Sequence, residues 1–148
     1  MRNVFRTNNS LVPTILRLVL GIVFFAHGSQ KALGWFGGAG FSKTLAGFHS
    51  YMGIPEPLAV LAIAAEFLGG IGLIVGLLGR VAAFGITINM LVAIFKVHLP
   101  NGFFMNWMGN QKGEGYEYHL LAIAIAIAIM VMGSGALSID RLIAKRAI

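Results

Sequence analysis

Eight side chains that ionise or form hydrogen bonds stand within, or at the ends of, otherwise apolar segments of this 148-residue chain. They are His27, Lys31, Glu66, Asn89, Lys96, His98, Glu117 and His119. An ionisable group is costly to keep in a hydrocarbon environment, and by default it marks a functional site. These eight residues are therefore our candidate ligand-binding residues. Their pattern assigns a catalytic role to none of them.

A quinone is the ligand that this set of side chains would suit. Its two carbonyls need hydrogen-bond donors, which His27, Lys31 and Lys96 would supply, and Glu66 would relay protons during reduction. Its apolar tail would need a groove open to lipid. Aromatic side chains would stack on the ring or line the mouth of the site; those expected there are Trp35, Phe36, Phe103 and Phe104.

The same residues also have structural interpretations. Glu66 could form an ion pair with His27 or Lys31 that locks the helices together. Asn89 could form a hydrogen bond between two helices, which is the use we favour for it. Polar side chains near a helix end often extend to the membrane interface; those concerned are Arg17, Lys96 and His98.

Other chemistries have less support. The chain has no cysteine, which excludes thiolate chemistry and cysteine-ligated metal clusters. No two histidines stand four residues apart, so no helix presents a two-histidine face, and we expect neither a metal site nor haem. The 11 lysines and arginines give a net charge of +6, but they are scattered and form no basic aromatic stretch. We therefore expect no nucleic-acid partner.

The composition predicts the elements that position these residues. Hydrophobic residues make up 57% of the chain and charged residues only 11%, whereas soluble domains carry about 25% charged residues. The mean hydropathy is +0.83. A membrane-spanning helix needs roughly 20 apolar residues. Four segments meet this need, and they predict a single all-α integral membrane domain over 1–148, a bundle of four transmembrane helices at about 11–33, 57–78, 81–99 and 118–137.

The distribution of basic residues predicts the orientation of this bundle. Six lysines and arginines lie near the two termini and the turn at 79–80, and three lie in the opposite loops, where glutamates balance them. Both termini are therefore expected in the cytoplasm. Residues 41–52, in the long outer loop, are expected to form a short helix at the outer interface.

Depth along the predicted helices brings the polar residues together. At about 1.5 Å per residue, His27 and Glu66 lie at similar heights in the membrane. The remaining charged candidates lie somewhat further out, so we expect one polar cluster in the outer half of the bundle. Glu66 is also expected to share a face with a stripe of small residues facing the bundle interior, namely Gly69, Gly72, Gly76 and Gly79.

Several motifs resemble the DoxX family of bacterial inner-membrane proteins. They are RLVLG at 17–21, HGSQKALGWFGG at 27–38, AEFLGG at 65–70, GLLGR at 76–80, VHLPNGFF at 97–104, GYEY at 115–118 and LSID at 137–140. The resemblance covers about residues 11–141 and implies a multi-pass protein of the bacterial inner membrane. The family name derives from resemblance to a subunit of an archaeal thiosulfate:quinone oxidoreductase, and some members are associated with redox-stress complexes. This implies quinone-linked redox work, but no catalytic residue can be carried over.

The leading hypothesis is thus a membrane subunit of a quinone-linked redox system. The chain has no recognisable flavin or nicotinamide site, so its electrons would come from a redox partner protein. A non-enzymatic membrane scaffold, or a protein that binds a lipid or small molecule, is the first alternative. The second is a homo-oligomeric transporter or channel, since four helices rarely enclose a pore alone.

Overall fold

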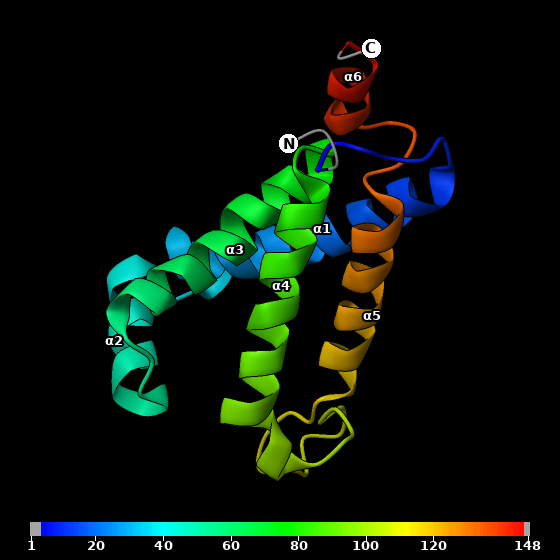
Figure 1. Ribbon diagram of the computed structural model, residues 1–148. Coiled ribbons are helices and arrows are strands. Elements are labelled where there is room, and N and C mark those ends of the chain that lie inside the picture. Colours follow the sequence, from blue (N-terminus) through cyan, green and yellow to red (C-terminus); the bar gives the residue numbers. More distant parts are fainter. Residues whose placement is uncertain (1–3, 147–148) are drawn as a thin grey trace.

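The computed structural model describes residues 4–146, and all the regular structure in that range is helical (Figure 1). The elements are α1 (Leu11–Ala32), the short 3-10 turn η1 (Trp35–Gly37), α2 (Phe41–Met52), α3 (Glu56–Val75), α4 (Gly79–Ala93), the π-helical η2 (Ile94–His98), the 3-10 turn η3 (Leu99–Asn101), α5 (Glu117–Met132) and α6 (Ile139–Arg146). The all-α prediction is confirmed for the described residues. The short helix expected at 41–52 is present as α2.

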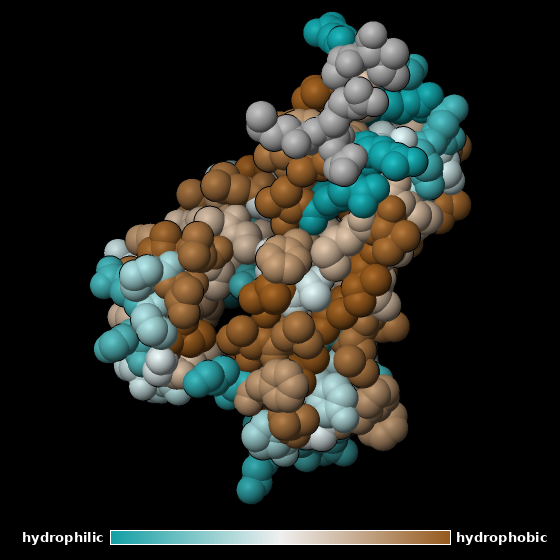
Figure 2. All heavy atoms as spheres, viewed as in Figure 1, coloured by the Kyte–Doolittle hydropathy of each residue, from teal (hydrophilic) through white to brown (hydrophobic). Residues whose placement is uncertain are grey.

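Three of these helices are long and apolar enough to cross a membrane: Leu11–Ala32, Glu56–Val75 and the continuous segment Gly79–Asn101. Their outward side chains are mostly hydrophobic, as the brown surface in Figure 2 shows. The fourth apolar helix, α5, has 16 residues and is shorter than the sequence predicted. It ends at Met132 because Gly133 and Gly135 adopt positive φ angles, which glycine tolerates at no steric cost.

The helices converge at one end of the molecule and separate at the other (Figure 1). At the closed end, the turn between α3 and α4 lies beside residues 4–10, the turn after α5, and α6. At the open end, α3 diverges from α4 and extends toward α2. The long loop at this end connects η3 to α5. A core of large apolar residues, including Phe24, Leu73, Ile86 and Ile129, fills the space between α1, α3, α4 and α5.

Glycines bring α1 and α3 into backbone contact. A Cβ added to Gly28 would lie 2.5 Å from the backbone nitrogen of Phe67, and one added to Gly70 would lie equally close to that of Phe25. The face of α3 that carries Glu66 therefore includes Gly70. The predicted stripe of Glu66 with Gly69 and Gly72 is wrong, because those two glycines face the α4 side, near Ala82 and the turn. The predicted third member of that stripe, Gly76, ends α3 in a left-handed conformation.

Arg17 is buried at the closed end, and its side chain is hydrogen-bonded to four backbone carbonyls. It is 2% exposed, and its guanidinium donates to the carbonyls of Leu73 and Ile74 at 2.6 Å, of Ser134 at 2.8 Å, and of Leu137. The first two carbonyls belong to the last turn of α3, where no intrahelical donor remains and the helix dipole is negative. The interpretation of Arg17 as a side chain that extends to the interface is wrong, because it is buried in protein.

Asp140 completes the closed end. Its carboxylate accepts from the backbone N–H of Leu78 at 2.7 Å and of Gly79 at 3.0 Å, and from the Ser134 hydroxyl at 2.6 Å. Free N–H groups at a helix start favour a carboxylate acceptor, so Asp140 caps α4 from a distant point in the chain. The sequence motif at 137–140 contained this residue without indicating its role.

Replacing Arg17 by lysine should destabilise the fold. A single ammonium cannot reach carbonyls of both α3 and the turn after α5, and each buried carbonyl left unpaired costs about 1–3 kcal/mol. We expect Arg17→Lys to lower the free energy of unfolding by about 2–4 kcal/mol, measured by equilibrium unfolding in detergent micelles. Arg146→Lys, at an exposed position of α6, is the matched control and should be neutral. Equal stability of the two variants would contradict this role for Arg17.

Candidate functional site

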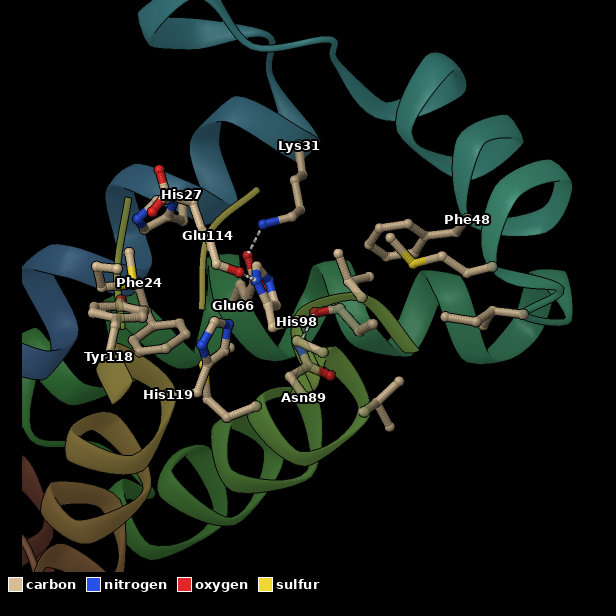
Figure 3. Close-up of a pocket in the computed structure, with 18 residues that line it drawn as sticks. Phe24, His27, Lys31, Phe48, Glu66, Asn89, His98, Glu114, Tyr118 and His119 are labelled. Carbon is tan, nitrogen blue, oxygen red and sulfur yellow. Dashed lines mark hydrogen bonds and ion pairs between the residues drawn. The ribbon is translucent and has the colours of Figure 1, made fainter. Parts of the chain in front are cut away.

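A cavity of ≈390 Å³ lies near the open end of the bundle, where α1, α3, α4 and α5 separate (Figure 3). Its walls are largely apolar. Phe48 and Met52 of α2 and Met105 of the loop are among the apolar residues that line it. The size and lining are typical of sites for small molecules, which combine apolar walls with a few convergent polar groups.

Six of the eight candidate residues line this cavity: His27, Lys31, Glu66, Asn89, His98 and His119. Five helical elements contribute them, namely α1, α3, α4, η2 and α5, so residues far apart in the sequence meet around one space. The other two candidates lie elsewhere. Lys96 is exposed and lines a separate groove on the outside of α3 and α4. The Glu117 carboxylate accepts from the backbone N–H of Met105 at 2.8 Å and thereby holds the loop.

The Lys31 ammonium and the Glu66 carboxylate form an ion pair at 2.5 Å (Figure 3). The Lys31 side chain is 26% exposed and that of Glu66 is 8% exposed. The pair thus joins α1 to α3 next to the cavity. An ion pair of Glu66 with Lys31 was one of the two pairings that the sequence left open, and it is the one that forms.

A second polar group lies on the α5 side of the cavity. The rings of His98 and His119 have their centroids 4.1 Å apart, and His98 Nδ1 lies 2.8 Å from the Glu114 carbonyl oxygen. In that bond Nδ1 must donate, because a carbonyl only accepts. His119 is 5% exposed, and neither its Nδ1 nor the Tyr118 hydroxyl has a hydrogen-bond partner within the described part of the chain.

Buried polar atoms are nearly always hydrogen-bonded, so each unpaired one needs an explanation. Tyr118 and His119 both line the cavity, and Figure 3 shows the His119 ring directed toward Glu66 and His98. Together they offer a phenol donor and an imidazole to a molecule within the cavity. The cavity therefore has two polar regions, the Lys31–Glu66 pair and the group of Tyr118, His98 and His119.

Asn89 forms the hydrogen bond between helices that was predicted for it. Its side-chain amide donates to the Ala62 carbonyl at 2.7 Å and so joins α4 to α3. It also lines both the cavity and the outer groove. Its side chain thus stands where these two spaces meet.

Sequence reasoning missed several lining residues. The aromatic residues expected at the mouth do not line the cavity, whose aromatic residues besides the histidines are Phe24, Phe48 and Tyr118. One signal was available, since Phe24 stands seven residues from both Arg17 and Lys31 on the inward face of α1. Tyr118 and the loop residue Glu114 carried no such pattern. No group of three or more His, Asp or Glu side chains gathers as a metal site within residues 4–146.

Comparison with known proteins adds the family. The DoxX family model matches residues 12–99. The chain is 32% identical over 131 residues to the Bacillus subtilis (strain 168) protein named "Putative oxidoreductase CatD", covering 88% of this chain and 86% of that one. It is 30% identical over 134 residues to an uncharacterized protein of Haemophilus influenzae (strain ATCC 51907 / DSM 11121 / KW20 / Rd), covering 88% and 90% respectively. No solved structure matches.

A double-mutant cycle should show how strongly Lys31 and Glu66 interact. We expect Lys31→Met and Glu66→Gln each to lower the free energy of unfolding, and the double variant to lose less than their sum. Contacting charges typically couple by about 0.5–3 kcal/mol, and the partial exposure of Lys31 favours about 1 kcal/mol. Equilibrium unfolding in detergent micelles measures this coupling.

The control cycle is Lys43→Met with Glu56→Gln. Both residues are exposed, and they form no ion pair in the described structure. Their coupling should be close to zero. An additive result for the Lys31 and Glu66 variants as well would show that the ion pair does not stabilise the fold.

Proposed function

The chain belongs to the DoxX family, and from this premise we propose that it is a membrane subunit of a quinone-linked redox system that binds a quinone in the cavity near the open end. Membership in the family and the name of the Bacillus subtilis relative support a membrane protein associated with redox work. The observation that carries the finer proposal is the cavity with its two polar regions and unpaired buried groups.

The donor set fits the chemistry of a quinone ring. A quinone carries two carbonyl oxygens across a planar ring, and each becomes a hydroxyl when two electrons and two protons are added. Lys31 would donate a hydrogen bond to one oxygen, and Tyr118 with His119 would bind the other. Glu66 is positioned to accept or return a proton beside Lys31. The electrons would come from a redox partner protein.

The proposal includes a topology of four spans, with both termini in the cytoplasm and α2 at the outer interface of the bacterial inner membrane. The open end with its cavity would then face outward, and the closed end inward. With 16 residues, α5 is about 24 Å long, shorter than a hydrocarbon core of about 30 Å. Arg17 supports its role as the fourth span, because it satisfies carbonyls of the turn that follows α5, and non-helical backbone at membrane depth needs such partners.

A second candidate function is a scaffold or lipid-binding protein without redox activity. The observation that favours it is the formed Lys31–Glu66 ion pair, which joins α1 to α3 without any ligand. Under this proposal the pair would act as a structural lock. The cavity would then hold a lipid or another small amphiphile.

Cysteine labelling tests the topology. The chain has no cysteine, so each introduced one is unique. We expect Asn110→Cys, in the exposed loop at the open end, to react with a membrane-impermeant maleimide in intact cells. Asn8→Cys, exposed at the closed end, should react only after permeabilisation. Labelling of both residues in intact cells would contradict an odd number of spans between Asn8 and Asn110, and the reverse pattern would contradict the orientation.

Quinone extraction tests the function. We expect protein purified in native lipid nanodiscs to carry isoprenoid quinone, and the His27→Ala/Glu66→Gln double variant to carry at least about tenfold less, because losing hydrogen bonds that involve a charged group costs about 1.5–3 kcal/mol. Mass spectrometry of solvent extracts measures this. The control variant is His49→Ala/Glu56→Gln, at exposed positions outside the cavity. Absence of quinone from the wild type would favour the scaffold proposal.

A further inference from the structure

We propose that the ligand enters the cavity sideways from the lipid, between α3 and α4, and leaves its apolar chain in the groove outside these helices. The ligand class would then be a long-chain isoprenoid quinone and not a water-soluble one. This inference rests on the proposed function, because it assumes that the cavity holds the head group. Three features of the structure support it.

The first feature is a groove of ≈890 Å³ that follows the seam between α3 and α4. Its lining is apolar except for Asn89 and Lys96 near one end. Small residues let the two helices approach at its floor. A Cβ on Gly69 would lie 3.7 Å from that of Ala82, and one on Gly85 would lie 3.1 Å from that of Ala65. Exposed large side chains form its sides; these include Leu61, Leu68, Phe84 and Ile88.

The second feature is that the groove and the cavity are adjacent and share part of their walls. Ile54, Ala62, Asn89 and Val92 line both spaces. The hydrogen bond from Asn89 to the Ala62 carbonyl crosses the seam between α4 and α3 at this point. Beyond it α3 and α4 diverge (Figure 1), and Figure 2 shows a notch there, with hydrophobic atoms around it.

The third feature is the apolar lining that α2 and the loop before α5 contribute to the cavity. It consists of Phe48 and Met52 of α2 and Met105 of the loop. A water-soluble ligand would have to pass these apolar side chains, whereas a ligand dissolved in the bilayer would meet the gap between α3 and α4 directly. In hydrocarbon an apolar groove gains nothing from hydrophobic burial. The groove therefore acts as a route and a space for the chain, and the polar cavity retains the head group.

The test compares two probes in nanodiscs free of quinone: a benzoquinone with a polyisoprenoid chain and the same benzoquinone without it. The variant is Ile88→Trp, at a 44% exposed position that lines the groove and does not line the cavity. We expect it to lower occupancy by the long-chain probe at least about tenfold, equivalent to about 1.4 kcal/mol, and to change that of the short probe by less than about threefold. Val131→Trp, 72% exposed on α5 and outside both spaces, is the matched control and should change neither.

A second measurement needs no variant. A long-chain quinone with a photoreactive diazirine at the end of its chain should label the wild-type protein on α3 and α4, at residues that line the groove. Labelling spread over the exposed faces of α1 and α5, or equal loss of both probes in Ile88→Trp, would overturn the lateral route while leaving the cavity as the quinone site. Failure of the wild type to bind either probe would overturn the proposed function, and this inference with it.

Discussion

A single guanidinium organises the closed end of this bundle. Arg17 of α1 donates to carbonyls at the end of α3 and in the turn after α5, all of which would otherwise be buried without partners. Asp140 performs the opposite task, because it accepts from the first free N–H groups of α4. These two buried charges thus satisfy backbone groups at the end of α3, at the start of α4 and in the turn after α5, and Arg80 donates to the Met130 and Val131 carbonyls at the end of α5. The helices converge where these bonds hold them, and they are free to separate at the other end.

That separation creates both spaces on which the proposed function depends. Close contacts through Gly69 and Gly85 hold α3 against α4 over part of their length, and the bond between Asn89 and Ala62 lies where they diverge. The open end has few bonds between backbone groups of different helices. It is lined instead by side chains whose hydrogen bonds and charges can turn toward a ligand, among them Lys31 and Glu66.

The sequence predicted the parts that depend on local pattern. Apolar length predicted helices, and depth along them predicted that His27 and Glu66 lie at similar heights within one polar cluster. It did not predict contacts to backbone groups, since a carbonyl carries no sequence signal. For this reason Arg17 was expected at the interface, and Glu117 was assigned to the ligand although it binds the Met105 amide. The sequence placed Gly69 on the face of α3 that carries Glu66, but the glycine on that face is the adjacent Gly70. Which of the two glycines faces α1 depends on how α3 packs, and the sequence pattern does not show this.

The contrast between the two ends bears on why Lys31 and Glu66 are retained. Arg17 is bonded to neutral carbonyls and has no space beside it, so its role is structural. The Lys31–Glu66 pair is partly exposed and borders a cavity. Buried ion pairs contribute little to stability compared with apolar residues of the same size, because their desolvation offsets their attraction. If α1 and α3 only needed to adhere, the contacts of Gly28 and Gly70 would suffice. A pair that faces a cavity, near an unpaired tyrosine and histidine, is better explained by the hydrogen bonds and proton transfers that a bound head group requires.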